Sequence, residues 1–243
     1  MRVVELWRYP VKSLQGERLA EAAIDALGIA GDRRWALFDR DTGLGLTARR
    51  VPELLFASAR LRDDGGVEVV LPDGRVAGGP VAASAALSGW LGRRLELRAA
   101  TEQGDVAPTY ETPADEDVPD PTEWLQWEGA PGPFHDSPRI RLSLVSTGTL
   151  GTWDRRRFRA NVVLDGEGED GLRGTEAELG TVRLRFGIPI ARCVMTTRPQ
   201  PGGIGRDTSV LKTIHRDRDG LLAVRAAVLR PGTVRTGDLL ARG

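Results

Sequence analysis

Apolar and polar residues alternate over short stretches along most of the chain, which is the pattern of β-strands that bury one face. Turn-forming triplets such as Asp41-Thr42-Gly43 and Pro72-Asp73-Gly74 separate these stretches. Many short strands at close spacing are typical of antiparallel barrels and sandwiches, so we predict a mostly β protein, a β-barrel with a few short helices. The expected strands cover residues 3–9, 19–24, 33–39, 44–48, 55–61, 67–71, 95–99, 141–145, 181–186, 221–228 and 234–240.

Helical patterns are rare in this chain. Residues 84–91 form the first candidate helix, with Ser84 as a possible N-cap. Residues 146–149 are a hydroxyl-rich turn that opens a short helix toward Trp153, and residues 210–215 form a third candidate. These segments are short, so the predicted fold class remains mostly β.

The amino-acid composition of the sequence changes near residue 100. Residues 101–138 contain seven prolines, are acidic and have few aliphatic side chains. A disordered linker has that composition, but Trp124, Trp127 and Phe134 favour a long loop packed on the body of the protein. We therefore predict one domain over residues 1–100 and a second over residues 101–243, which the proline-rich loop introduces.

The charge balance narrows the class of partner. The chain has 34 lysines and arginines and 34 aspartates and glutamates, so its formal net charge is zero. A protein that binds nucleic acid or acidic membranes would show a basic excess, and we expect neither partner. No apolar stretch is long enough to span a membrane, and a strand begins directly at the N-terminus with no signal-peptide pattern. The expected location is the cytoplasm.

Cys193 is the only cysteine of the chain. One cysteine excludes an internal disulfide, a four-cysteine zinc site and an iron–sulfur cluster held by this chain alone. Cys193 follows an apolar strand and lies next to Arg192, and a neighbouring cation favours a thiolate. A thiolate is a soft ligand that suits a redox-active metal. The ordinary alternative is a small buried apolar residue.

Cationic and hydroxyl side chains recur near the expected strand ends. Such a set would suit a phosphorylated ligand that is rich in hydrogen-bonding groups. Each residue alone has a more ordinary interpretation, as a solvated arginine, a helix cap or a turn. Lys12 is one of only two lysines in the chain, which indicates a position that requires a compact ammonium group. The candidates are Lys12, Ser13, Arg33, Thr47, Arg49, Ser146, Thr147, Arg159 and Asn161.

Several of these residues stand in motifs that resemble one family, in that family's order. The string Arg192-Cys193-Val194-Met195-Thr196-Thr197, followed by a Pro-x-Pro-Gly loop, is similar to the cysteine signature of MOSC domains. That family binds the molybdenum cofactor and includes the mitochondrial amidoxime-reducing component and its bacterial relatives. The other similar motifs are Tyr9–Ser13, Gly31–Trp35, Leu46–Arg49, Phe134–Pro138, Val145–Thr147, Arg157–Val163 and Pro231–Val234 with Gly237-Asp238.

The resemblance implies an N-terminal barrel packed on a MOSC barrel, with the cofactor between them. It makes Cys193 the catalytic residue and the protein ligand of molybdenum. The implied activity is reduction of amidoximes, hydroxylamines or N-hydroxylated bases, with electrons from a separate protein of reductase, ferredoxin or cytochrome type. Lys12, Ser13, Arg33 and Arg159 would hold the cofactor phosphate and pterin, and further contacts would come from Thr47, Arg49, Ser146, Thr147, Asn161 and Arg192.

Two other functions stay open on the sequence. A protein that carries the molybdenum cofactor or persulfide sulfur without turnover needs the same thiol and the same anion pocket. A thiol enzyme would use Cys193 as its nucleophile and needs a base, for which His215 is the candidate. The proton donor of a reductase is not identified, and Asp136 and Asp165 are candidates only because they lie near the motifs in sequence.

Overall fold

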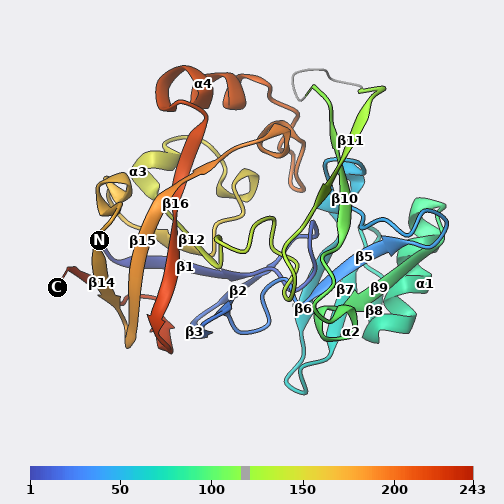
Figure 1. The fold of residues 1–243 in the computed structure, drawn as a ribbon, viewed down its shortest axis with the longest axis horizontal. Coiled ribbons are helices and arrows are strands. Elements are labelled where there is room, and N and C mark those ends of the chain that lie inside the picture. The colour runs from blue at the N-terminus through green and yellow to red at the C-terminus, as the bar shows by residue number, and fades with distance from the viewer. Residues whose placement is uncertain (116–120, 243) are drawn as a thin grey trace.

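The largest sheet of the molecule joins strands from both ends of the chain. A computed structural model describes residues 1–115 and 121–242, and in this part of the chain the sheet has eight strands (Figure 1). All neighbouring strands are antiparallel except β12 and β13. The order is β18 (Leu240–Arg242), β14 (Glu176–Leu179), β15 (Val182–Ala191), β16 (Leu221–Arg230), β12 (Leu142–Ser146), β13 (Val162–Leu164), β1 (Val3–Arg8) and β2 (Glu17–Leu19).

The sheet buries one face because apolar residues take alternate positions along its strands. In β15, Val182, Leu184 and Phe186 point into the core, and the arginines between them are exposed. The register between β15 and β16 shifts around Pro189, which has no N–H to donate to the ladder. Beyond this irregularity β15 leads directly to Cys193. The predicted mostly β fold class is confirmed.

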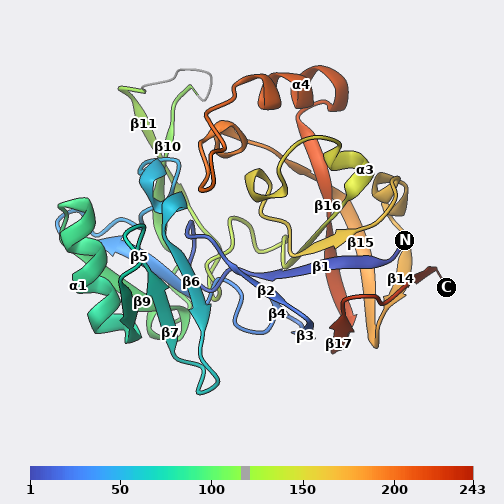
Figure 2. The same cartoon turned by 180° about the vertical axis from the view of Figure 1, so that it is seen from behind.

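Two smaller sheets and one long helix form the other half of the molecule (Figures 1 and 2). Helix α1 (Gly79–Leu91) packs against β7, β8 and β9 of these sheets. The two sheets consist of β5 (Trp35–Asp39) and β9 (Leu95–Ala99), and of β6 (Ser58–Leu61), β7 (Val67–Val70) and β8 (Val76–Gly78).

The first four strands of the chain join the half that contains the large sheet. Strands β1 and β2 enter the large sheet itself. A further sheet of β17 (Gly232–Arg235), β3 (Glu21–Asp25) and β4 (Gly28–Ile29) shares one apolar core with it.

Helix α1 begins at Gly79, and the expectation that Ser84 caps it is wrong. Pro80 stands in the first turn, where its fixed φ suits a helix start and its missing N–H costs nothing. The Ser84 hydroxyl donates instead to the Pro80 carbonyl inside the helix.

The remaining helices are short, and two of them confirm predicted segments. Helix α3 (Thr147–Leu150) follows the hydroxyl-rich turn, and helix α4 (Ser209–Arg218) contains residues 210–215. Within the described ranges, no helix has the length and apolar content needed to cross a membrane. The others are α2 (Ala100–Gln103) and the 3₁₀ helices η1 (Pro52–Phe56), η2 (Arg155–Arg157), η3 (Glu169–Leu172) and η4 (Val194–Thr197).

Four predicted strands differ from the structure. Residues 19–24 divide between β2 and β3, and residues 55–56 of the predicted strand 55–61 belong to η1. Residues 44–48 hold only isolated bridges at Gly45, because the chain then turns away and the Ala48 N–H donates to the Ser13 hydroxyl. Residues 234–240 divide between β17 and β18, since the turn at Gly237, with a φ of 99°, interrupts the extended backbone.

The proline-rich segment packs on the body of the protein, as its aromatic residues predict. It forms a hairpin of β10 (Thr109–Pro113) and β11 (Trp124–Glu128), which stands between the two halves in Figure 1. The rings of Tyr110 and Trp127 lie 4.9 Å apart in this hairpin. Farther along, Phe134 is fully buried, with its ring 5.8 Å from that of Phe38. Residues 116–120 of the same predicted loop lie outside the described residues.

Replacing Phe134 by alanine is expected to lower the free energy of unfolding by about 3–5 kcal/mol, because it leaves a cavity against Phe38. Urea unfolding of Phe134→Ala and wild type measures the difference. Leu125→Ala is the control in the same segment, since Leu125 is 51% exposed and its loss should change stability by less than about 0.5 kcal/mol. Equal midpoints for all three proteins would show that residues 129–140 are not packed on the core.

Candidate functional site

A cavity of about 200 Å³ lies where the two halves of the molecule meet. Its walls come from six separate parts of the chain: residues 12–13, 33, 47–49, 135–143 and 157–161, and the end of β15 with η4. The sequence candidates among the lining residues are Lys12, Ser13, Arg33, Thr47, Arg49, Arg159, Asn161, Arg192 and Cys193.

Backbone hydrogen bonds bring the N-terminal part of this wall together. The Lys12 N–H donates to the Trp35 carbonyl at 2.8 Å, and the Arg33 N–H donates to the Tyr9 carbonyl at 2.8 Å. The Ser13 hydroxyl accepts from the Ala48 N–H at 3.0 Å, which ties residues 47–49 to the same turn. Residues that are far apart in sequence therefore share one rim of the cavity.

Ser146 and Thr147 are the two candidates that do not line the cavity. Strand β12 passes the cavity at Ser143 and carries the chain away from it before Ser146. The Ser146 hydroxyl caps α3 by accepting from the Thr149 N–H and donates to the buried Glu169 carboxylate. Thr147 is exposed at the start of the helix. The Ser146 hydroxyl is thus engaged as the cap of α3, and the expected cofactor contacts of Ser146 and Thr147 stay a prediction.

Asn161 lines the cavity, but its side chain mainly fastens strands. Its Oδ1 accepts from the Ser143 N–H at 3.2 Å and from the Ser143 hydroxyl at 3.0 Å. Its Nδ2 donates to the Trp7 carbonyl at 3.3 Å. Asn161 thus joins β12 to β1 and places Ser143 on the cavity wall.

Positive charge dominates the lining. Six of the side chains on the cavity wall are cations, and Asp136 is the single carboxylate among the lining residues that the structure describes. Such an excess attracts an anion, and phosphate is the anion that lysine and arginine bind best. The six cations are Lys12, Arg33, Arg49, Arg157, Arg159 and Arg192.

Asp136 forms ion pairs with two of these cations. Lys12 Nζ contacts one carboxylate oxygen, and Arg49 Nη2 lies 3.6 Å from the other. Desolvation works to raise the pKa of Asp136, but the charges of Lys12 and Arg49 outweigh it and hold the pKa well below its usual range. Asp136 is therefore ionised at neutral pH and has no proton to donate. Asp165 is not in the cavity wall and instead accepts from the Arg2 N–H.

Backbone strain gathers at this cavity. Ser13, Arg33 and Arg159 have φ angles of 71°, 49° and 52°, and all three line the cavity. Side chains other than glycine and asparagine rarely adopt this left-handed region, because Cβ crowds the backbone there. Strain of this kind persists where the surroundings impose it, and it clusters at binding and active sites.

Tyr9 lies between two of the strained arginines. The guanidinium carbons of Arg159 and Arg33 lie 4.4 Å and 5.1 Å from the centre of its buried ring, so its face supports both cations. Burial, together with the charge of Arg33, lowers the pKa of Arg159 to about 10. Arg159 thus stays protonated at neutral pH, and its Nη1 donates to the Leu14 carbonyl at 2.7 Å.

The thiol of Cys193 also lines the cavity. Cys193 is half-buried and stands between the end of β15 and the first residue of η4. Arg192 donates to the carbonyls of Leu222 and Phe158 at 2.9 Å and 3.1 Å. Burial lowers the pKa of Arg192 to about 10, and the nearby Cys193 partly opposes that shift. Arg192 therefore remains a cation next to the thiol.

Arg157 holds the loop that follows Cys193. Its Nη1 donates to the carbonyls of Thr196 and Arg198 at 3.2 Å and 3.1 Å, and its Nη2 donates to the Gly205 carbonyl at 2.8 Å. Sequence reasoning missed this role, because Arg157 belongs to a run of three arginines that looks like a solvated surface. Its partners are backbone carbonyls, which leave no signal in the sequence.

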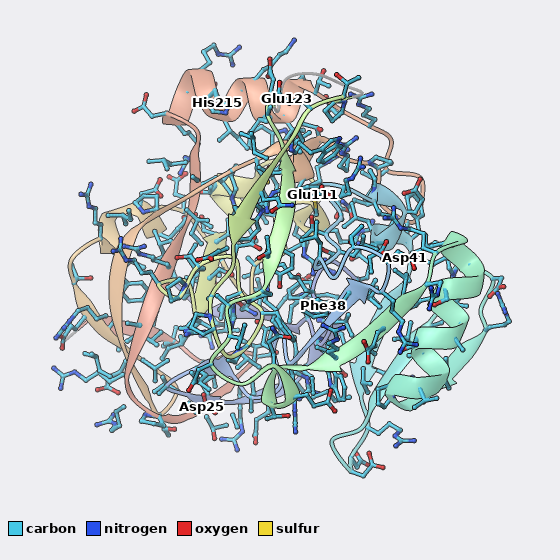
Figure 3. All side chains as sticks on the ribbon, turned by 45° about the vertical axis from the view of Figure 1, so that its right-hand side comes forward. Asp25, Phe38, Asp41, Glu111, Glu123 and His215 are labelled. Atoms are coloured by element: carbon cyan, nitrogen blue, oxygen red, sulfur yellow. The ribbon has the colours of Figure 1, made fainter. Side chains whose placement is uncertain are left out.

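His135 is a second cavity residue that the sequence did not single out, although it stands inside one of the matched motifs. It is 3% exposed. Burial and the charge of Arg33 lower its pKa to about 3, so it is neutral at physiological pH. His215, by contrast, is exposed on α4 and does not line the cavity (Figure 3). The cysteine–histidine pair that a thiol enzyme requires is therefore not formed with His215.

The donor set of the cavity fits a phosphorylated, hydrogen-bonding cofactor with a soft metal. The buried polar atoms of lining residues that have no hydrogen-bond partner include Thr47 Oγ1, His135 Nε2 and Arg192 Nη2. Buried polar groups are normally satisfied, so unpartnered ones at a cavity indicate a place for ligand atoms. The cations and Cys193 line the same cavity, so both parts of the molybdenum cofactor find suitable groups.

The low pKa of His135 predicts how stability depends on pH. Its pKa is about 3 in the folded protein and about 6.5 when unfolded, so the unfolded chain binds the extra proton between these values and stability falls as the pH drops below about 6.5. Between pH 7 and pH 5 this residue should lower the free energy of unfolding by about 2 kcal/mol.

Urea unfolding at both pH values measures this loss. The loss of unfolding free energy should be smaller in His135→Gln, while His215→Gln should match wild type. An unchanged loss in His135→Gln would contradict the assignment.

Arg157→Gln should loosen the loop after Cys193. Three backbone carbonyls lose a charged donor, so we expect a loss of roughly 2–3 kcal/mol in unfolding free energy. Hydrogen exchange over residues 194–205 should become faster than in wild type. Arg183→Gln is the matched control, since Arg183 forms only an exposed ion pair with Glu176. Equal exchange in this loop for both variants would mean that Arg157 does not hold it.

Comparison with known proteins gives two domain matches. The family model of the MOSC N-terminal beta barrel domain matches residues 1–110, and that of the MOSC domain matches residues 137–241. No curated protein matches the chain.

Solved structures with detectable similarity are distant. The YuaD protein from Bacillus subtilis is 15% identical, with a TM-score of 0.42, over 98% of this chain and 92% of that chain. YiiM from Geobacillus stearothermophilus is 15% identical, with a TM-score of 0.35, over 58% of this chain and 74% of that chain. It is the two domain matches, which follow one another along the sequence, that show this chain to belong to the MOSC family.

Proposed function

We propose that the protein is a molybdenum-cofactor-dependent oxidoreductase that reduces N-hydroxylated compounds such as amidoximes, hydroxylamines and N-hydroxylated bases. The observation that supports it most is that one cavity brings the chain's only thiol together with six cations. The MOSC family includes reductases that depend on this cofactor. The cavity offers what each end of the cofactor requires, which a buried structural cysteine would not need.

In the part of the wall that the N-terminal turns form, Lys12, Arg33 and Arg49 would hold the phosphate of the cofactor. Ammonium and guanidinium groups form strong, short hydrogen bonds to phosphate oxygens. The Ser13 hydroxyl accepts from Ala48 and keeps its own proton to donate to the ligand. Arg159 and the unpartnered Thr47 hydroxyl and His135 nitrogen would bind the pterin.

Cys193 Sγ would be the protein ligand of molybdenum. The bound cofactor would supply the two-electron redox chemistry of the reduction. The chain's own residues orient it: Arg157 fixes the loop after Cys193, and Arg192 is fixed by two backbone carbonyls beside the thiol. Ionised Asp136 does not provide the proton, so the proton would come from solvent or from the substrate's own exchangeable groups.

Electrons would reach the cavity from a separate protein of reductase, ferredoxin or cytochrome type. A single cysteine cannot hold an iron–sulfur cluster. A carrier of the cofactor would use the same residues without turnover, and a functional test separates the two.

Metal and pterin analysis of protein from a host that makes the cofactor tests this proposal. Wild type should hold close to one molybdenum and one pterin, because both the thiol and the cations are in place. Cys193→Ala should lose most of the molybdenum, by about tenfold or more, since the protein's thiolate ligand is gone. His215→Gln, outside the cavity, should load like wild type.

Substrate-dependent reoxidation of the reduced, loaded protein then separates a reductase from a carrier. Oxidation by benzamidoxime and not by benzamidine supports the reductase. A loaded protein that benzamidoxime leaves reduced is a carrier. Absence of pterin from wild type, while another molybdoenzyme loads in the same cells, would overturn the cofactor assignment.

A further inference from the structure

Asp136 occupies an unusual place, as an anion at the centre of a cationic wall. Its carboxylate pairs with Lys12 and lies 3.6 Å from Arg49 Nη2, and the charge of Arg33 also acts on it. These three cations are those that would hold a phosphate. The Asp136 side chain is 54% exposed and lines the cavity. The carboxylate thus stands where an incoming phosphate would have to bind.

We propose that Asp136 is the resident counter-ion of this anion subsite and that a ligand phosphate takes its place on Lys12 and Arg49. The proposal rests on the proposed function only in naming the cofactor as the natural ligand. The exchange itself requires only a phosphate group. Asp136 is then a specificity-determining residue, because it admits to the subsite only ligands that carry enough negative charge to displace it.

Lys12 explains why a resident anion is needed. Its side chain is buried, and a buried ammonium without a counter-charge is very costly. Its other partners are uncharged: the Phe134 carbonyl at 3.1 Å and the ring of Tyr110, 4.7 Å from Nζ. Burial lowers the pKa of Lys12, and Asp136 opposes that shift. Asp136 therefore keeps Lys12 charged in the absence of a ligand.

The charges explain why a phosphate displaces Asp136. A phosphate ester carries between one and two negative charges at neutral pH, whereas the carboxylate carries one. Two anions on the same cations repel strongly at contact distance. Asp136 lies in irregular backbone, outside the strands and helices, and its side chain reaches solvent. It can leave the cations without breaking a strand or helix, so exchange favours the dianion.

Titration of the cofactor-free protein with inorganic phosphate tests the proposal. Calorimetry is performed at constant ionic strength, and at a pH at which phosphate is the dianion. Asp136→Asn should bind phosphate roughly tenfold more tightly than wild type, because the competing charge is removed while both cations remain. Asp170→Asn is the control, since Asp170 pairs with Arg218 outside the cavity and should leave phosphate binding unchanged.

Thermal melting keeps the test decisive if Asp136→Asn is poorly folded. Without its counter-ion the variant should melt at a lower temperature than wild type, and phosphate should raise that temperature more than it does for wild type. The double variant Lys12→Gln with Asp136→Asn should lose the tight phosphate binding. Equal or weaker phosphate binding by Asp136→Asn would overturn the proposal and leave Asp136 as a residue that positions Lys12.

Molybdenum and pterin loading tests the proposed function, and the phosphate affinity of Asp136→Asn tests the role of Asp136 separately. If wild type loads molybdenum and pterin but Asp136→Asn gains no affinity for phosphate, the cofactor assignment stands and the counter-ion role is wrong. If Asp136→Asn gains affinity for phosphate but wild type never holds pterin, the anion subsite is real and its ligand is another phosphorylated compound.

Discussion

Mutual repulsion of cations around one cavity is the constraint that the rest of the site must satisfy. The structure meets it largely with backbone carbonyls, each taken from a different part of the chain. Lys12 donates to the Phe134 carbonyl, Arg159 to that of Leu14 and Arg192 to those of Phe158 and Leu222. These contacts do two things at once, since they stabilise buried charge and tie together segments that are remote in sequence.

The N-terminal strands that enter the large sheet give these contacts a rigid base. Because β1 lies beside β13 and leads into the turn at Lys12, the N-terminal cations are fixed to the sheet that also delivers Cys193 through β15. Neither half of the chain carries a complete site. The thiol and the N-terminal cations come into one cavity only when both halves have folded together.

The sequence predicts the parts of this arrangement that depend on local pattern. Alternating apolar residues reveal β1, β15 and β16, and the rarity of lysine and cysteine singles out Lys12 and Cys193. It does not predict roles that depend on distant partners. Ser146 caps α3, and the sequence does not distinguish a cap from a binding hydroxyl because the two have the same signature. Arg157 was overlooked because carbonyl acceptors are present at every residue and mark none.

The left-handed backbone at Ser13, Arg33 and Arg159 has a consequence for how this protein can be changed. Each such residue raises the energy of the folded chain by roughly 1–3 kcal/mol, and glycine would remove that cost along with the side chain that the proposed ligand would contact. Selection for stability alone would therefore replace these strained residues first, whereas selection for ligand binding preserves the strain. A relative that has glycine at these three positions would be expected to keep the fold and to have lost the ability to bind the proposed ligand.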